Sequence, residues 1–257
     1  MLFAFKLLVT PLLIGLVSLA GRRWGPAVSG WLVGLPLTSA PVAVFLALDQ
    51  GTAFAAKAAQ ATLIGLISVA VFCLTYSWLS FRLHWLYSTL AGWAMFFIVT
   101  FGLEQLSLPL LVSFLAVIVF LSLVLLLLPH NRSLATSTKP PQWETPLRML
   151  VATSFVIILT GIASVIGPRL SGLLTPFPIF ATILGAFTHR FQESAAACKL
   201  LRGVVTGSFT FAVFFLVIAS LLEQWGIVLA FSTAIVAALL IHGTSLFLLS
   251  RYMAVHE

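Results

Sequence analysis

Long apolar segments alternate with short polar stretches along the whole chain. The pattern predicts nine membrane-spanning helices, over residues 2–20, 28–48, 52–79, 83–103, 106–128, 146–166, 170–188, 194–222 and 227–252. The stretch 129–145 has loop composition and predicts a linker. Backbone polar groups in a bilayer must be satisfied within helices or closed barrels, and no barrel-like alternation is present. We therefore expect an all-α, polytopic membrane helix bundle.

The chain contains one segment twice. Residues 25–72 align without a gap to residues 167–214, and 15 of the 48 columns are identical. Gly, Pro, Gln and Lys match in this register, which shared membrane composition does not explain. We expect an internal duplication, in which positions that this gapless register brings together are equivalent. The predicted parts are a first copy (1–105, four helices), a connecting helix (106–128), the linker (129–145) and a second copy (146–257, four helices).

This 4+1+4 arrangement predicts inverted repeats. Four helices return the chain to its starting side and the connecting helix crosses once more, so the second copy starts on the opposite side from the first. Nine spans place ten basic residues on one side and three (Lys6, Lys57, Arg169) on the other. The positive-inside rule then puts the N-terminus outside and the linker and C-terminus in the cytoplasm. We expect a multi-pass protein of the bacterial inner (cell) membrane.

Composition excludes several classes of protein. The chain is 61% hydrophobic and 7% charged, as expected of an integral membrane protein. The net charge of +7 comes from scattered basic residues that fit topology signals, so no nucleic-acid partner is expected. Cys73 and Cys198 form no disulfide or metal-binding pattern. Metalloprotease, P-loop and hydrolase motifs are missing, so we expect neither an enzyme nor a cofactor or metal site.

One segment of the second copy resembles a known family. Residues 171–181 read SGLLTPFPIFA and are followed by Glu193, Ala197 and Leu201-Arg202-Gly203. This is similar to four-helix inner-membrane proteins of the GlpM type. The first copy departs from the pattern, with Leu35 before Pro36 and Gln60 in place of Arg202. The resemblance implies a tandem, inverted fusion of two such units, and the family's link to envelope polysaccharide production implies an envelope-assembly partner protein.

Prolines interrupt the same predicted helix in both copies. Pro36 and Pro41 lie within 28–48, and Pro176 and Pro178 within 170–188. Proline removes a backbone hydrogen bond, and broken helices at a repeat interface form substrate sites in transporters. The alternative is a kink that serves packing alone. The substrate-binding candidates here are Pro36, Thr38, Ser39, Pro41, Thr175, Pro176, Phe177 and Pro178.

Each copy also places a lysine seven residues after a glutamine, as Gln50 with Lys57 and Gln192 with Lys199. The pairs lie two turns apart on one helical face. Inward-facing lysines would favour an anionic substrate, whereas snorkelling to the headgroups is the alternative. All four residues are candidates for substrate binding.

His242 lies deep in an apolar span, and its equivalent in the first copy is Thr100. Ionisable groups within a membrane are functional candidates, so proton coupling is one interpretation. A hydrogen bond to a neighbouring backbone carbonyl is the other.

These features predict a secondary transporter for a small anionic or zwitterionic solute, working by alternating access, with proton coupling through His242 as one option. The alternatives are a non-transporting accessory subunit of envelope polysaccharide or lipid assembly, or a lipid flippase. A lateral opening beside the interrupted helices would favour the flippase. The expected partners are the bilayer and a small-molecule or lipid-linked substrate.

Overall fold

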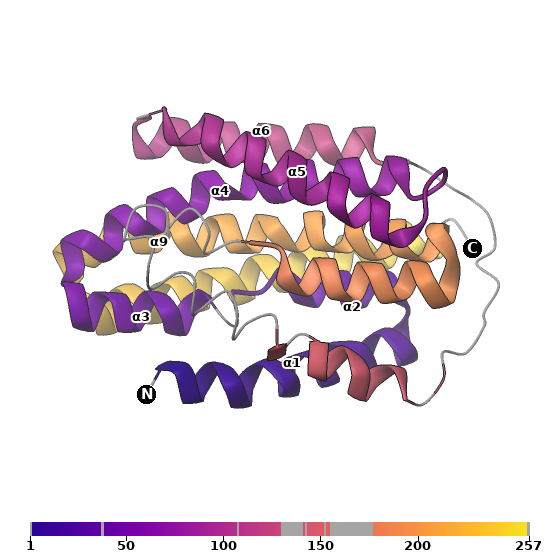
Figure 1. The fold of residues 1–257 in the computed structure, drawn as a ribbon. Helices are drawn as coiled ribbons and strands as arrows, with labels where there is room; N and C mark the ends of the chain where they lie inside the picture. The colour runs from indigo at the N-terminus through magenta and orange to yellow at the C-terminus, as the bar shows by residue number, and fades with distance from the viewer. Residues whose placement is uncertain are drawn as a thin grey trace.

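The computed structural model describes residues 2–36, 39–106, 108–129, 141, 143–151, 153–154 and 177–255, and the side chains among them from Pro11 to Thr244. These residues form helices and connecting turns with no strand (Figure 1). The helices are α1 (Leu2–Trp24), α2 (Pro26–Val33), α3 (Ser39–Gln50), α4 (Thr52–Leu79), α5 (Trp85–Glu104), α6 (Leu110–Leu127) and α9 (Ile179–Val255). Residues 144–151 are also helical.

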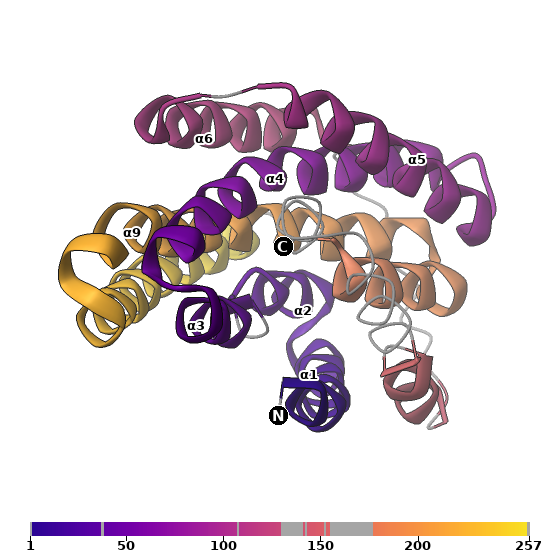
Figure 2. The same ribbon diagram turned by 60° about the vertical axis from the view of Figure 1, so that its left-hand side comes forward.

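α9 consists of three helical segments. Its backbone leaves the helical region at Glu193 (φ 75°) and at Gly226 (φ 72°). The first segment is therefore 179–192, the second 194–225 and the third 227–255. Both breaks turn the chain back on itself, so the three segments lie side by side (Figures 1 and 2).

Four helices of the described part are long and apolar enough to cross a membrane. They are α4, α5, α6 and, within α9, the stretch Ile179–Thr244. α6 exposes Leu111, Val119 and Leu126, as expected of a helix that faces lipid. The protein is thus a helical membrane protein by length and composition.

α4 and α9 form the centre of the bundle. α5 and α6 lie on one side of them and α1 on the other (Figures 1 and 2). α4 and the second segment of α9 run antiparallel, because Ser80 at the end of α4 accepts a hydrogen bond from Ser194 at the start of the segment (2.6 Å). Cys198 donates to the Ser77 carbonyl oxygen in the same region (3.5 Å).

Backbone breaks recur at equivalent positions of the two copies. Gly51, before α4, has φ 88° and ψ 162°, and its equivalent Glu193 has φ 75° and ψ 170°. α5 follows a non-helical residue at His84, and the third segment of α9 follows one at the equivalent Gly226. Corresponding stretches of the two copies therefore share helix boundaries.

Glycines allow α2 to approach α9 closely. A Cβ on Gly30 would lie 1.8 Å from the Leu200 carbonyl oxygen, and one on Gly34 would lie 2.2 Å from the Gly207 Cα. From the other side, a Cβ on Gly203 would lie 2.1 Å from the Ala27 carbonyl oxygen. The Gly30-xxx-Gly34 motif thus packs on Gly203-xxx-Gly207, the backbone-to-backbone contact that such motifs favour.

The predicted elements agree with the structure where it describes them, apart from shifts of up to four residues at helix ends, such as α1 continuing to Trp24 and α6 starting at Leu110. Residues 144 and 145, assigned to the linker, already belong to a helix, and the helix predicted to end at 188 continues to Gln192. Proline explains the predicted interruption: α2 ends at Val33 and α3 starts at Ser39. Most of the helix predicted over 146–166 and the start of that over 170–188 lie outside the described residues, so the nine-helix 4+1+4 arrangement stays a prediction.

Candidate functional site

A central cavity of about 80 Å³ lies where the interrupted helices meet the two long central ones. α2 and α3 contribute residues on either side of their interruption, and the first turn of α9 contributes the residues around Pro178. α4 and the second segment of α9 complete the wall. The lining residues are Val33, Gly34, Leu35, Ser39, Leu66, Val69, Phe177, Pro178, Ile179, Phe180, Ala181, Val204, Ser208 and Phe211.

Equivalent positions of the two copies line this cavity together. Four pairs of lining residues match in the register of the duplication: Leu35 and Phe177, Ser39 and Ala181, Leu66 and Ser208, and Val69 and Phe211. α4 and the second segment run antiparallel, so Leu66 and Ser208 mark the level at which the two equivalent helices cross. The cavity therefore lies where the two matching segments, 25–72 and 167–214, contact each other, midway along both helices.

Two helix N-termini border the central cavity. Ser39 is the first residue of α3, and Ile179 is the first residue of α9. The first N–H groups of a helix have no partner within it, and the helix dipole makes this end partly positive. The Ala40 and Ile179 N–H groups at these ends donate to the Pro36 and Phe177 carbonyl oxygens, and the Ser208 hydroxyl donates to the Val204 carbonyl oxygen. What the two termini add to this largely apolar cavity is therefore the partly positive ends of two helix dipoles.

The predicted prolines and lysines do not come together in one site. Phe177, Pro178 and Ser39 line the central cavity, and Pro36 is buried beside it. Pro41 is half-buried in α3. Thr38, Thr175 and Pro176 lie outside the described residues.

Lys57, Lys199 and Gln50 are exposed, and none of them lines the central cavity. Both lysines project from the side of their helix opposite to the buried alanines, such as Ala55 and Ala197. This placement fits the snorkelling alternative for the lysines.

His242 makes the same buried contact as its equivalent in the first copy. Its Nδ1 lies 3.0 Å from the Thr210 Oγ1, and Thr100 donates to the Ser68 Oγ at 2.9 Å. In the register of the duplication, Thr100 matches His242 and Ser68 matches Thr210. The His242 ring also stacks on Trp31, with centroids 3.6 Å apart. His242 thus joins α2 to α9, and its partner is a side-chain hydroxyl.

Replacing His242 with phenylalanine is expected to keep the ring stacking on Trp31 and to lose the hydrogen bond to Thr210. A buried hydrogen bond contributes about 1 kcal/mol, and an unpartnered hydroxyl costs about 1–3 kcal/mol. We expect a fall of a few degrees in the unfolding temperature, measured on purified protein. The double variant with Thr210→Val should recover part of the loss, and a larger fall in the double variant would contradict this role.

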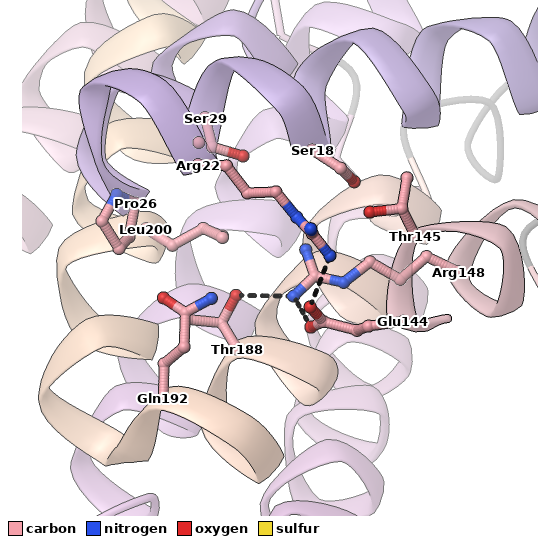
Figure 3. A pocket seen from close by; sticks show the side chains of 11 residues that line it. Ser18, Arg22, Pro26, Ser29, Glu144, Thr145, Arg148, Thr188, Gln192 and Leu200 are labelled. Carbon is pink, nitrogen blue, oxygen red and sulfur yellow. Dashed lines mark hydrogen bonds and ion pairs between the residues drawn. The ribbon is translucent and has the colours of Figure 1, made fainter. Parts of the chain in front are cut away.

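A charged cluster closes the bundle at the end where α1 terminates (Figure 3). Glu144 forms an ion pair with Arg22 (3.5 Å) and a short one with Arg148. Arg148 also donates to the Thr188 hydroxyl (3.4 Å), and Arg22 donates to the Pro141 carbonyl oxygen (3.0 Å). Glu144 is 1% exposed and Arg148 is 5% exposed. This charged cluster (Arg22, Glu144, Arg148, Thr188) joins α1 to the second copy.

The charged cluster lies about one helical turn beyond the central cavity. Ser29 and Leu200 line the small space beside the charged cluster, whereas Val33 and Val204, four residues further along the same helices, line the cavity. The free volume beside the charged cluster is about 10 Å³, roughly that of one water molecule. Gln192, predicted as a substrate ligand, lines this space instead of the cavity.

The sequence interpretation missed the charged cluster. It used Arg22 and Arg148 only as topology signals and left Glu144 in the linker. One signal was present, because Glu144 and Arg148 are four residues apart and can pair on one helix. The pairing of Glu144 with Arg22 depends on tertiary structure, because Arg22 lies far earlier in the sequence.

Comparison with protein-family models, with curated proteins and with solved structures finds no match for the chain.

Proposed function

We propose that this protein is a secondary membrane transporter for a small anionic or zwitterionic solute, with the central cavity as its substrate site. The observation that carries the proposal is that equivalent residues of the two copies line this cavity together. Transporters with inverted repeats bind substrate at the repeat interface, near the midplane and beside interrupted helices. The central cavity lies between the two matching segments, beside interrupted helices and midway along α4, which supports the proposal.

The helix directions support an inverted relation between the copies. α4 and the second segment of α9 occupy equivalent places in the two copies and run antiparallel. α1 begins at one end of the bundle and α9 ends at the other (Figure 1). Both features are expected when four helices, a connecting helix and four further helices follow one another.

The proposal assigns substrate charge to helix ends and gives the lysines no role. The N-termini of α3 and α9 border the cavity and stabilise negative charge without a buried cation. Lys57 and Lys199 are exposed and outside it. Transport would alternate between opening toward the charged cluster and opening toward the opposite end, and the charged cluster is closed here.

Filling the central cavity is expected to reduce transport strongly. The Ser208→Leu substitution adds volume in the cavity, and we expect solute uptake to fall by about tenfold or more, because misplacing a bound substrate by about 1 Å costs rates of that order. Reconstituted vesicles would be tested with labelled inorganic phosphate, small carboxylates and amino acids. A ligand would first be selected by its thermal stabilisation of the wild type.

Ser122→Leu is the matched control. Ser122 and Ser208 both donate to the carbonyl oxygen four residues earlier, at 2.8 and 2.9 Å, but Ser122 is exposed on α6. Ser122→Leu, Lys57→Gln and Lys199→Gln should retain uptake within about twofold. Uptake by Ser208→Leu equal to that of the wild type, or no uptake of any of these solutes above protein-free vesicles, would refute the proposal.

A further inference from the structure

An apolar groove of about 630 Å³ opens on the side of the bundle. Its floor is the first segment of α9, and its two walls are α5 and the helix over 144–151, which lie on either side of that segment (Figure 2). Ile183, Ala186 and Phe187 form the floor, and the walls include Leu90 and Leu147. The central cavity and the charged cluster lie outside this groove.

The groove has the depth of one lipid leaflet. Along α5 it extends from Trp85 to Trp93, and along the first segment from Phe191 to Thr182. Eight or nine residues of helix span about 12–14 Å. Half of a hydrocarbon core of about 30 Å is about 15 Å. A groove of this length that starts at the headgroup level would reach about the middle of the membrane.

The two ends of the groove differ chemically. The outer end is lined by Trp85, Trp143 and Arg190. Among the described residues that line the groove, Arg190 carries the charge. Its guanidinium carbon lies 5.7 Å from the Phe191 ring centroid, and the side chain is exposed. Tryptophan and arginine are the residues expected at the level of lipid headgroups. At the inner end, Trp93 donates to the Thr182 hydroxyl (3.1 Å) and closes the groove.

We propose that the groove binds one acyl chain of an anionic phospholipid, with its phosphate beside Arg190. The apolar walls accept the chain over a length that matches a single leaflet, and Arg190, the cationic side chain that lines the groove, favours negative charge. This inference concerns lipid binding and stands whether or not the chain transports a solute.

The lipid would contact the wall of the central cavity. Trp93 lies with its ring centroid 5.9 Å from that of Phe177, and Phe177 lines the cavity. Phe96 and Phe97 pack on Phe177 from the same helix, with centroids 5.1 and 5.7 Å away. One layer of aromatic side chains therefore separates the groove from the cavity.

The inference is tested by photo-crosslinking in vesicles of equimolar phosphatidylglycerol and phosphatidylcholine whose chains differ in mass. Benzoylphenylalanine would replace Leu90, which lines the groove, or Tyr87, which is exposed on the same helix outside it. We expect adducts at position 90 to be enriched in phosphatidylglycerol by about fivefold. One basic residue near lipid phosphate contributes about 1 kcal/mol of binding free energy, which corresponds to this enrichment. Adducts at position 87 should reflect the bulk composition.

Two variants separate headgroup selection from chain binding. Arg190→Gln should return the lipid ratio at position 90 to that at position 87, and we expect the substitution of this exposed residue to change stability little. Ala186→Phe fills the groove and should reduce the total yield at position 90, whereas Ala94→Phe, exposed elsewhere on α5, should not. Equal ratios at positions 90 and 87 in the wild type, or enrichment that persists in Arg190→Gln, would overturn the proposal.

Discussion

Replacing Gly30 with leucine is expected to separate α2 from the second segment of α9 and to destabilise the protein by roughly 3 kcal/mol or more. A Cβ at this position would lie 1.8 Å from the Leu200 carbonyl oxygen and 2.7 Å from its carbon. The obstacle is backbone, which cannot rotate away as a side chain does, so the cost lies at or above the usual range for overpacking. For a chain of this size, we expect the unfolding temperature of the purified protein to fall by roughly 10 °C.

Gly102→Leu is the control, because it also replaces a helical glycine with leucine. It therefore loses the same backbone freedom and adds the same apolar surface. Gly102 also lies within a helix, α5, and a Cβ there would meet nothing within 4 Å. The unfolding temperature of Gly102→Leu should remain within about 2 °C of the wild type. A similar loss in both variants would show that the close approach of α2 is not the cause.

Glu144→Gln is expected to destabilise the protein by about 3–5 kcal/mol, because it leaves the Arg148 charge buried without its counter-ion. Arg22, the second cation beside Glu144, would also lose its ion pair. The measurement is again the unfolding temperature of the purified protein. Glu223→Gln removes an exposed carboxylate from α9 and should change it by less than about 2 °C.

A double-mutant cycle assigns the loss to the ion pair. Arg148→Gln alone is expected to leave Glu144 with only the longer pair to Arg22, and the double variant Glu144→Gln with Arg148→Gln should be more stable than the sum of the single effects predicts. Additive losses would mean that Glu144 and Arg148 stabilise the fold through separate contacts. The proposed opening of this end through loss of one shared ion-pair cluster would then be wrong.

Local chain chemistry made the helix boundaries predictable. α4 begins and ends where the apolar pattern placed it, at Thr52 and Leu79, after Gly51 and before the basic residue Arg82. Pro36 ended α2 as expected, because proline removes the hydrogen bond that would continue the helix. The register of the duplication also predicted that Thr100 would be the equivalent of His242.

The direction of the lysines was also present in the sequence but was not used. α4 buries Ala55, Ala56 and Ala59, small residues that recur at helical spacing and mark its packing face. Lys57 lies between them in sequence and about 100–200° away around the helix. Matching positions in two copies show common descent, and they do not show that a side chain faces inward.

The charged cluster and the apolar groove were beyond the sequence for a different reason. Both depend on how the helix over 144–151 packs beside α1 and beside the first segment of α9, and no local pattern specifies such a placement. Trp85, Trp143 and Arg190 come from three separate elements. Composition predicts tryptophan and arginine near the headgroups, but it does not predict that they surround one groove.

The proposed fusion of two copies into a single chain has a consequence for the direction of the proposed transport. An antiparallel pair of identical four-helix units would carry the same residues at its two ends, so opening either end would cost the same free energy. In the register of the duplication, Leu2 and Lys6 are the first-copy equivalents of Glu144 and Arg148. Glu144 therefore has no acidic counterpart in the first copy. The two copies have diverged at these positions, so the ion pairs of Glu144 that close one end use residues that the first copy does not repeat. The resting population of the two states can therefore be unequal without any membrane potential or solute gradient.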